Sequence, residues 1–109
     1  MKREINLFVE DILSSINAIE EFSKDMDKRD LLSSRLKQSA IIREIEIIGE
    51  AVKNIPEHIK NKYKEIEWRK IAGMRDVIIH SYFRVDLDAV WNAIKKDIPR
   101  LKKQIEKIK

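Results

Sequence analysis

The 109-residue chain has no cysteine and only two glycines and two prolines. Without cysteine, neither a disulfide framework nor a thiolate metal site can form, which fits a reducing cytoplasm. The scarcity of glycine and proline favours long helices over sheets with many tight turns. No apolar run approaches the roughly 20 residues that span a bilayer, and Met1–Glu4 is not followed by the apolar block of a signal peptide. We therefore expect a soluble, cytoplasmic protein that is not exported.

Charged residues are abundant, at 39% of the chain, but they nearly balance to a net charge of +4. This charge permits an anionic partner such as RNA without demanding one. The densest basic segment is the C-terminal tail, with Arg100, Lys102, Lys103, Lys107 and Lys109. A solvated helix face explains that tail about as well as a surface that follows phosphates. The length predicts a single domain over residues 1–109, and a domain of this size often buries more surface by pairing with a copy of itself.

Apolar residues recur at helical spacing along most of the chain. Their pattern predicts helices over residues 4–27, 31–54 and 67–80, and a last one that continues to the C-terminus. Pro56 stops the second of these and can occupy the first turn of a short helix over residues 57–63. Asp86 is the expected N-cap of the fifth helix, and Pro99 is expected to kink or restart it. Gly49 lies inside the second helix, where glycine costs about 1 kcal/mol relative to alanine, so it marks a candidate close crossing. The sequence therefore predicts an all-α antiparallel bundle of about five helices.

Arg75, His80 and Tyr82 form an R-x4-H-x-Y motif on an apolar, helix-like background. Arginine matches phosphate oxygens bidentately, histidine exchanges protons near neutral pH, and the tyrosine hydroxyl can donate, accept or be modified. In one regular helix, Arg75 and His80 would lie roughly 140° apart around the axis and about 7.5 Å apart along it. They would not converge. Either the helix ends near Ile79 and turns His80 and Tyr82 back, or two copies meet at a twofold axis and build a composite site.

The motif and its flanks resemble the HepT-like branch of the HEPN superfamily. The resemblance covers about residues 5–102 and includes Ile47–Ala51, Trp68–Met74, the R-x4-H-x-Y motif, Val85–Asp86, Val90–Trp91 and Asp97–Pro99. It implies a helical bundle that acts as a homodimer, and a metal-independent endoribonuclease without a cofactor. Such proteins typically serve as the toxin of a type VII-like toxin-antitoxin pair. The implied partner is a minimal nucleotidyltransferase antitoxin, which silences the toxin by transferring AMP from ATP to the motif tyrosine.

The resemblance also implies a role for each residue of the motif. Arg75 and His80 match the catalytic pair, and Tyr82 matches the tyrosine that accepts AMP. The residue after the motif arginine is frequently asparagine in HEPN proteins, whereas this chain has Asp76 there, a candidate auxiliary residue that cannot donate as asparagine does. In the expected mechanism His80 takes a proton from the ribose 2′-hydroxyl, which attacks the adjacent phosphorus. Arg75 holds the phosphate and stabilises the charge that develops on it.

Each of these residues also has a simpler structural interpretation. His80 at the end of a helix is often only a cap that the helix dipole favours. Tyr82 fits a half-buried core position about as well as a functional one. Glu46 and Glu50, one turn apart, lack a third ligand at suitable spacing, so ion pairing on the helix surface is a better explanation for them than metal binding.

Two alternative functions therefore stay open beside the ribonuclease. In the first, the protein is a non-catalytic helical subunit that binds and positions a nucleotidyltransferase, and Tyr82 is only the acceptor of AMP. In the second, it is a plain helical interaction module, in which substitution of Arg75 and His80 would change nothing but stability.

Overall fold

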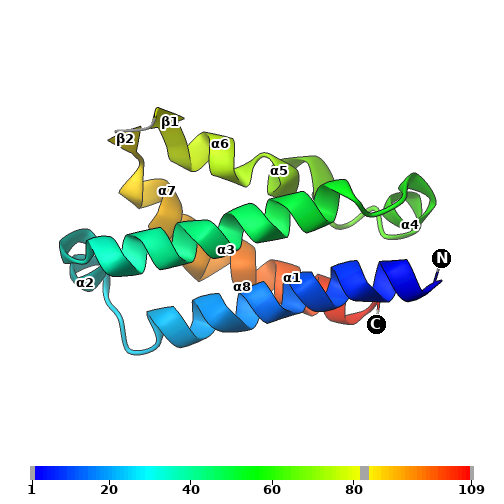
Figure 1. Cartoon of the computed structure of the whole chain (residues 1–109), viewed down its shortest axis with the longest axis horizontal. Helices are drawn as coiled ribbons and strands as arrows, with labels where there is room; N and C mark the ends of the chain where they lie inside the picture. The colour runs from blue at the N-terminus through cyan, green and yellow to red at the C-terminus, as the bar shows by residue number, and fades with distance from the viewer. Residues whose placement is uncertain (1, 82–83, 109) are drawn as a thin grey trace.

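Two long antiparallel helices, α1 (Lys2–Ser23) and α3 (Arg35–Lys53), form the centre of the structure (Figure 1). The computed structural model describes residues 2–81 and 84–108, and the backbone alone at residues 2–4, 80 and 81. Each helix turns its apolar stripe toward the other, because apolar side chains at three- and four-residue spacing share one face. The largest fully buried side chains are Ile12, Ile16, Ile19, Leu31, Ile41, Ile45, Ile48, Ile66, Ile78, Ile98, Leu101 and Ile105.

The prediction of one helix over residues 31–54 is wrong, because the structure has two helices there. The first, α2 (Lys28–Ser33), begins inside the polar cluster that follows α1, where the Asp27 carboxylate accepts a hydrogen bond from the Asp30 amide at 2.8 Å. The second, α3, begins after Ser34, whose hydroxyl accepts from the Lys37 amide at 3.1 Å. Short polar side chains that bond nearby amides favour helix starts over helix interiors, which explains both new boundaries.

The predicted short third helix is confirmed as α4 (Glu57–Lys62), with Pro56 at its N-cap. The predicted fourth helix over residues 67–80 is wrong as a continuous helix. It consists of α5 (Trp68–Ala72) and α6 (Met74–Ile78), which meet at Gly73. Strand β1 (Ile79–Ser81) follows and pairs antiparallel with β2 (Arg84–Val85). The helical pattern predicts no strand, yet a run of β-branched residues over 77–79 favours extended backbone at this point.

The last part of the chain begins as predicted, because the Asp86 carboxylate accepts from the Ala89 amide at 3.0 Å and caps α7 (Leu87–Asn92). A π-helical segment η1 (Ala93–Asp97) follows, and then α8 (Ile98–Glu106). In η1 the Ile98 amide bonds the Ala93 carbonyl, five residues back. Pro99 has no amide hydrogen and its ring crowds the carbonyl four residues back, so a wider turn just before it accommodates the ring. Pro99 therefore changes the helix as expected, but through a π-helical segment in a continuous helical backbone and not through a break.

Gly49 marks a close helix crossing, as predicted. A Cβ atom added to it would lie 3.2 Å from the Ala72 carbonyl oxygen, so α3 and α5 approach each other at backbone distance. The architecture is an all-α bundle with one short strand pair at an end of it, as Figure 1 shows. In the described ranges, no helix is both long and apolar enough to cross a membrane.

Candidate functional site

A cavity of about 580 Å³ lies beside the motif arginine and is lined by residues of α1, α3 and the segment α5–α6. Its floor includes Gly49 and Ala72, the pair that brings the two helices together. Side chains of both charges line it: Asp11, Arg43, Glu46, Glu50, Lys53, Arg75 and Asp76. These four carboxylates and three cations give a nearly balanced cavity, so a polyanion would gain little from its overall charge and must be held by individual contacts.

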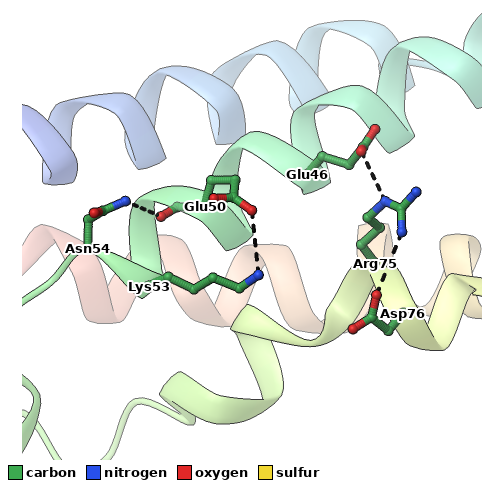
Figure 2. A network of polar contacts seen from close by, with 6 residues as sticks. All are labelled: Glu46, Glu50, Lys53, Asn54, Arg75 and Asp76. Carbon is green, nitrogen blue, oxygen red and sulfur yellow. Dashed lines mark hydrogen bonds and ion pairs between the residues drawn. The ribbon is translucent and has the colours of Figure 1, made fainter.

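Arg75 reaches this cavity from α6 and contacts two carboxylates (Figure 2). Its Nε–H donates to Glu46 Oε2 at 3.0 Å, and its Nη1 lies 3.7 Å from Asp76 Oδ1. Figure 2 shows the remaining guanidinium nitrogen pointing away from both carboxylates. The Arg75 side chain is 48% exposed, so it combines an anchored inner side with an outer side that a ligand can reach.

The structure places the other residues of the motif only in part. Asp76 lies beside Arg75 with a side chain that is 82% exposed. Helix α6 ends at Ile78, so His80 follows the helix and its backbone belongs to β1. That helix end agrees with the first of the two arrangements that would let Arg75 and His80 converge. The His80 side chain and the whole of Tyr82 lie outside the described residues, and their predicted roles stay predictions.

Glu46 is the residue of this site that the sequence analysis did not assign. The predicted ion pairing of Glu46 and Glu50 is confirmed, but only Glu50 pairs on its own helix, with Lys53 at 3.4 Å. The partner of Glu46 is Arg75, on another helix and 29 residues away. The signal that could have found this pair is Gly49, because a glycine that marks a crossing also indicates which side chains near it face another helix. Among the described side chains, no group of three or more histidines and acids is placed to hold a metal ion.

The basic C-terminal tail is partly engaged in ion pairs with other parts of the chain. Arg100 pairs with Glu67 at 3.4 Å, and Lys102 pairs with Glu20 at 2.9 Å. The hydrogen bond to Glu20 raises the pKa of Lys102 above its ordinary value. Because these two cations already contact carboxylates, the arrangement favours the solvated helix face over a surface that follows phosphates.

Fold and site together define the class of this protein. It is an all-α bundle with a half-exposed arginine in a charged cavity. The profile of the family described as "Ribonuclease HepT-like" matches residues 12–108. The chain belongs to this HepT-like ribonuclease family, and the resemblance inferred from the motif is confirmed. No solved structure matches the chain significantly.

Relatives of similar sequence carry ribonuclease names. The "Probable ribonuclease HepT" of Thermococcus cleftensis is 47% identical over 109 residues, which cover 100% of this chain and 99% of the relative. A "Putative RNase" of Methanocaldococcus jannaschii is 48% identical over 107 residues, 98% of this chain and 92% of the relative. A "Gamma-glutamylcyclotransferase and putative RNase" of the same organism is 47% identical over 108 residues. That match covers 99% of this chain but 49% of the relative, so the chain spans about half of that protein.

Proposed function

We propose that the protein is a metal-independent endoribonuclease that cleaves RNA by attack of the ribose 2′-hydroxyl. The observation that carries the proposal is Arg75, which lies half-exposed in the cavity as part of the R-x4-H-x-Y motif. The family membership supports it, as do three relatives whose names describe them as ribonucleases. A permanently charged guanidinium at the edge of a cavity is suited to hold a phosphodiester and to stabilise the charge that it gains during cleavage.

The reaction balances without an outside water molecule. His80 removes the proton of the 2′-hydroxyl, and the oxygen forms a bond to the adjacent phosphorus. The bond from phosphorus to the 5′-oxygen of the next nucleotide breaks, and that oxygen takes a proton from Tyr82 or from the histidine of a second subunit. The products are a 2′,3′-cyclic phosphate and a 5′-hydroxyl. Arg75 stabilises the added charge on the phosphate oxygens throughout.

The phosphate must compete with Asp76 for the outer side of Arg75. The Asp76 carboxylate lies 3.7 Å from Nη1, which is longer than a hydrogen bond, and its side chain is 82% exposed. An exposed ion pair of this kind contributes about 0–1 kcal/mol, so a phosphate that makes two charge-assisted hydrogen bonds can displace it. The asparagine frequent at this position in HEPN proteins would not compete in this way.

Cleavage of RNA in excess chelator tests the proposed activity. The protein is expressed without any partner, and intact mass shows that it is unmodified. We expect it to cut mixed cellular RNA as fast in EDTA as in buffer with Mg²⁺, because no step above uses a metal. The products should carry cyclic phosphate ends, which a 3′-end ligation assay detects.

Contaminating nucleases of the same chemistry are excluded by a matched preparation. The His80→Ala variant, purified in parallel and shown to be folded by circular dichroism, should leave the same RNA uncut. Equal cleavage by this variant would assign the activity to a contaminant or to other residues. No cleavage by an unmodified, dimeric parent would overturn the ribonuclease and favour the non-catalytic subunit that positions a nucleotidyltransferase.

We further propose that the protein acts as a homodimer and as the toxin of a type VII-like pair whose antitoxin is a minimal nucleotidyltransferase. Exposed apolar side chains beside the motif support an interface at this end of the bundle: Val77 on α6 is 61% exposed and Val85 on β2 is 39% exposed. Transfer of AMP to Tyr82 would add bulk and negative charge two residues from His80. Both would oppose the entry of an RNA phosphate.

Modification of Tyr82 is tested by co-expression with a minimal nucleotidyltransferase. We expect the intact mass of the protein to rise by one adenylyl group and its RNA cleavage to stop. The chain has two tyrosines, Tyr63 and Tyr82, which provides a matched pair of variants. Tyr63→Phe should still gain the adduct, whereas Tyr82→Phe should not. An adduct that persists in Tyr82→Phe, or one that forms without loss of cleavage, would contradict the proposed silencing.

A further inference from the structure

We propose that Glu46 is a positioning residue for the reaction, which holds the guanidinium of Arg75 by its inner edge so that the outer edge faces the scissile phosphate. Gly49 sets the helix spacing on which this contact depends. The inference rests on the proposed function, because that function gives Arg75 its part in cleavage. It gives a residue of α3 a part in the reaction, although α3 lies outside the R-x4-H-x-Y motif.

The geometry of the ion pair selects which edge of the guanidinium stays available. Arginine presents two edges that can bind an oxyanion bidentately, one that includes Nε and one formed by the two Nη atoms. Glu46 Oε2 accepts from Nε at 3.0 Å, so it occupies the first edge. Among the side chains that the structure describes, the second edge meets the longer Asp76 contact alone, 3.7 Å from Nη1. A phosphate can therefore take the outer edge while Glu46 keeps its hydrogen bond (Figure 2).

Glu46 is a suitable anchor because its helix is firmly held. Its neighbours on α3 include Ile45 and Ile48, which are 1% and 0% exposed, and its own side chain is 35% exposed. An arginine side chain has several rotatable bonds, so one that is 48% exposed would sample many positions without a partner. The carboxylate restricts it to the wall of the cavity before RNA arrives. A group held in place in this way needs less reorganisation during the reaction.

The close approach at Gly49 brings the two charged groups into register. Glu46 lies three residues before Gly49, and Arg75 lies three residues after Ala72. Helix α3 and the segment α5–α6 run in opposite directions (Figure 1), so the Gly49–Ala72 contact and the Glu46–Arg75 contact are neighbours along one crossing. A methyl group at Gly49 would lie 3.2 Å from the Ala72 carbonyl oxygen and would push the helices apart by a few tenths of an ångström. The glycine thus keeps Arg75 within reach of Glu46.

The test compares single-turnover cleavage of a defined RNA by parent, Glu46→Ala and Glu46→Gln in excess chelator. We expect Glu46→Ala to lower the rate at saturating RNA by about 10²-fold, because misplacement of a reacting group by about 1 Å has an effect of this size. The concentration of RNA that gives half the maximal rate should change much less, since Arg75 keeps its charge. Glu46→Gln retains an oxygen that accepts from Nε and should recover most of the rate.

Glu50→Ala is the matched control for charge. Glu50 lines the same cavity one turn further along α3, but it pairs with Lys53 instead of Arg75. Both alanine variants remove one negative charge from the cavity, so an effect of the overall field should appear in both. Positioning of Arg75 should appear in Glu46→Ala alone. Gly49→Ala leaves the charge of the cavity unchanged and should lower the cleavage rate less than Glu46→Ala does.

Each outcome separates this inference from the proposed function. An inactive parent overturns the proposed function itself. If the parent cuts RNA and Arg75→Ala does not, then a rate for Glu46→Ala equal to or above that of the parent overturns the role of Glu46. Equal losses of rate in Glu46→Ala and Glu50→Ala, or no recovery of the rate in Glu46→Gln, would also overturn the role of Glu46. Should Glu46→Ala fail to fold, Glu46→Met keeps the length of the side chain without its carboxylate and is expected to show the same loss.

Discussion

Replacement of Arg75 by alanine is expected to lower the rate of RNA cleavage by about 10²- to 10³-fold, the usual effect of removing one group that stabilises developing charge on an oxyanion. Among the described side chains of the motif, the Arg75 guanidinium is the cation that lines the cavity, and one of its nitrogens points away from both carboxylates (Figure 2). Arg43 and Lys53 also line the cavity, but neither belongs to the motif, and Lys53 pairs with Glu50 at 3.4 Å. The measurement is single-turnover cleavage of one defined RNA in chelator.

This loss should occur without loss of the fold. The Arg75 side chain is 48% exposed and its ion pairs lie at the surface, where each contributes about 0–1 kcal/mol. We therefore expect the urea midpoint of Arg75→Ala to stay close to that of the parent. Arg75→Lys, which keeps the charge but has no second donor in a fixed fork, should fall between the two in rate. Cleavage by Arg75→Ala at the rate of the parent would remove Arg75 from the mechanism.

Features set by short-range chemistry were predictable from the sequence. The apolar spacing of α1 and α8 identifies helices that bury one face, Pro56 identifies the start of α4, and Asp86 identifies the cap of α7. Gly49 could be recognised as a crossing because a glycine inside a helix needs a reason that outweighs its cost of about 1 kcal/mol.

The breaks within predicted helices could not be read from the same pattern. Around Gly73 the apolar spacing continues from Ile71 to Met74, so periodicity alone joins α5 and α6. Around Ser34 the residues are mostly polar, so no apolar period marks where α2 ends and α3 begins. What ends them is local: a hydroxyl that caps the next turn at Ser34, and the low helix propensity of glycine at Gly73. Strand β1 is three residues long, which is too short for a period of two to be visible.

The residues of the candidate site also differ in whether the sequence alone could reveal them. Arg75, Asp76 and His80 lie close together in the chain, so a motif can reveal them. Glu46 meets Arg75 because the fold brings α3 and α6 together. The sequence hints at this contact only through Gly49, which marks a crossing but does not identify the side chains that meet there. The structure is therefore needed to identify a residue that acts through a partner on another helix, whereas residues of one motif can be identified from the sequence.

A single 2′-deoxyribose at the nucleotide on the 5′ side of the scissile bond is expected to abolish cleavage there. In the proposed reaction the 2′-oxygen is the attacking atom, so its removal leaves no nucleophile, whatever Arg75 and His80 contribute. The effect should exceed that of any single side-chain substitution, because a missing reactant cannot be compensated by the remaining groups. The measurement uses a short RNA whose cut site has first been mapped with the parent protein.

The matched control carries the deoxyribose one nucleotide further along the same RNA. That substrate loses one hydroxyl as well, but the attacking oxygen remains, so it should be cut at nearly the rate of the unmodified RNA. Cleavage of the first substrate at the mapped site, with a 5′-phosphate or a linear 3′-phosphate from the start, would show attack by water. Such a result would leave the protein a nuclease but would remove the 2′-hydroxyl from its mechanism, and with it the role of His80 as the base that activates that hydroxyl.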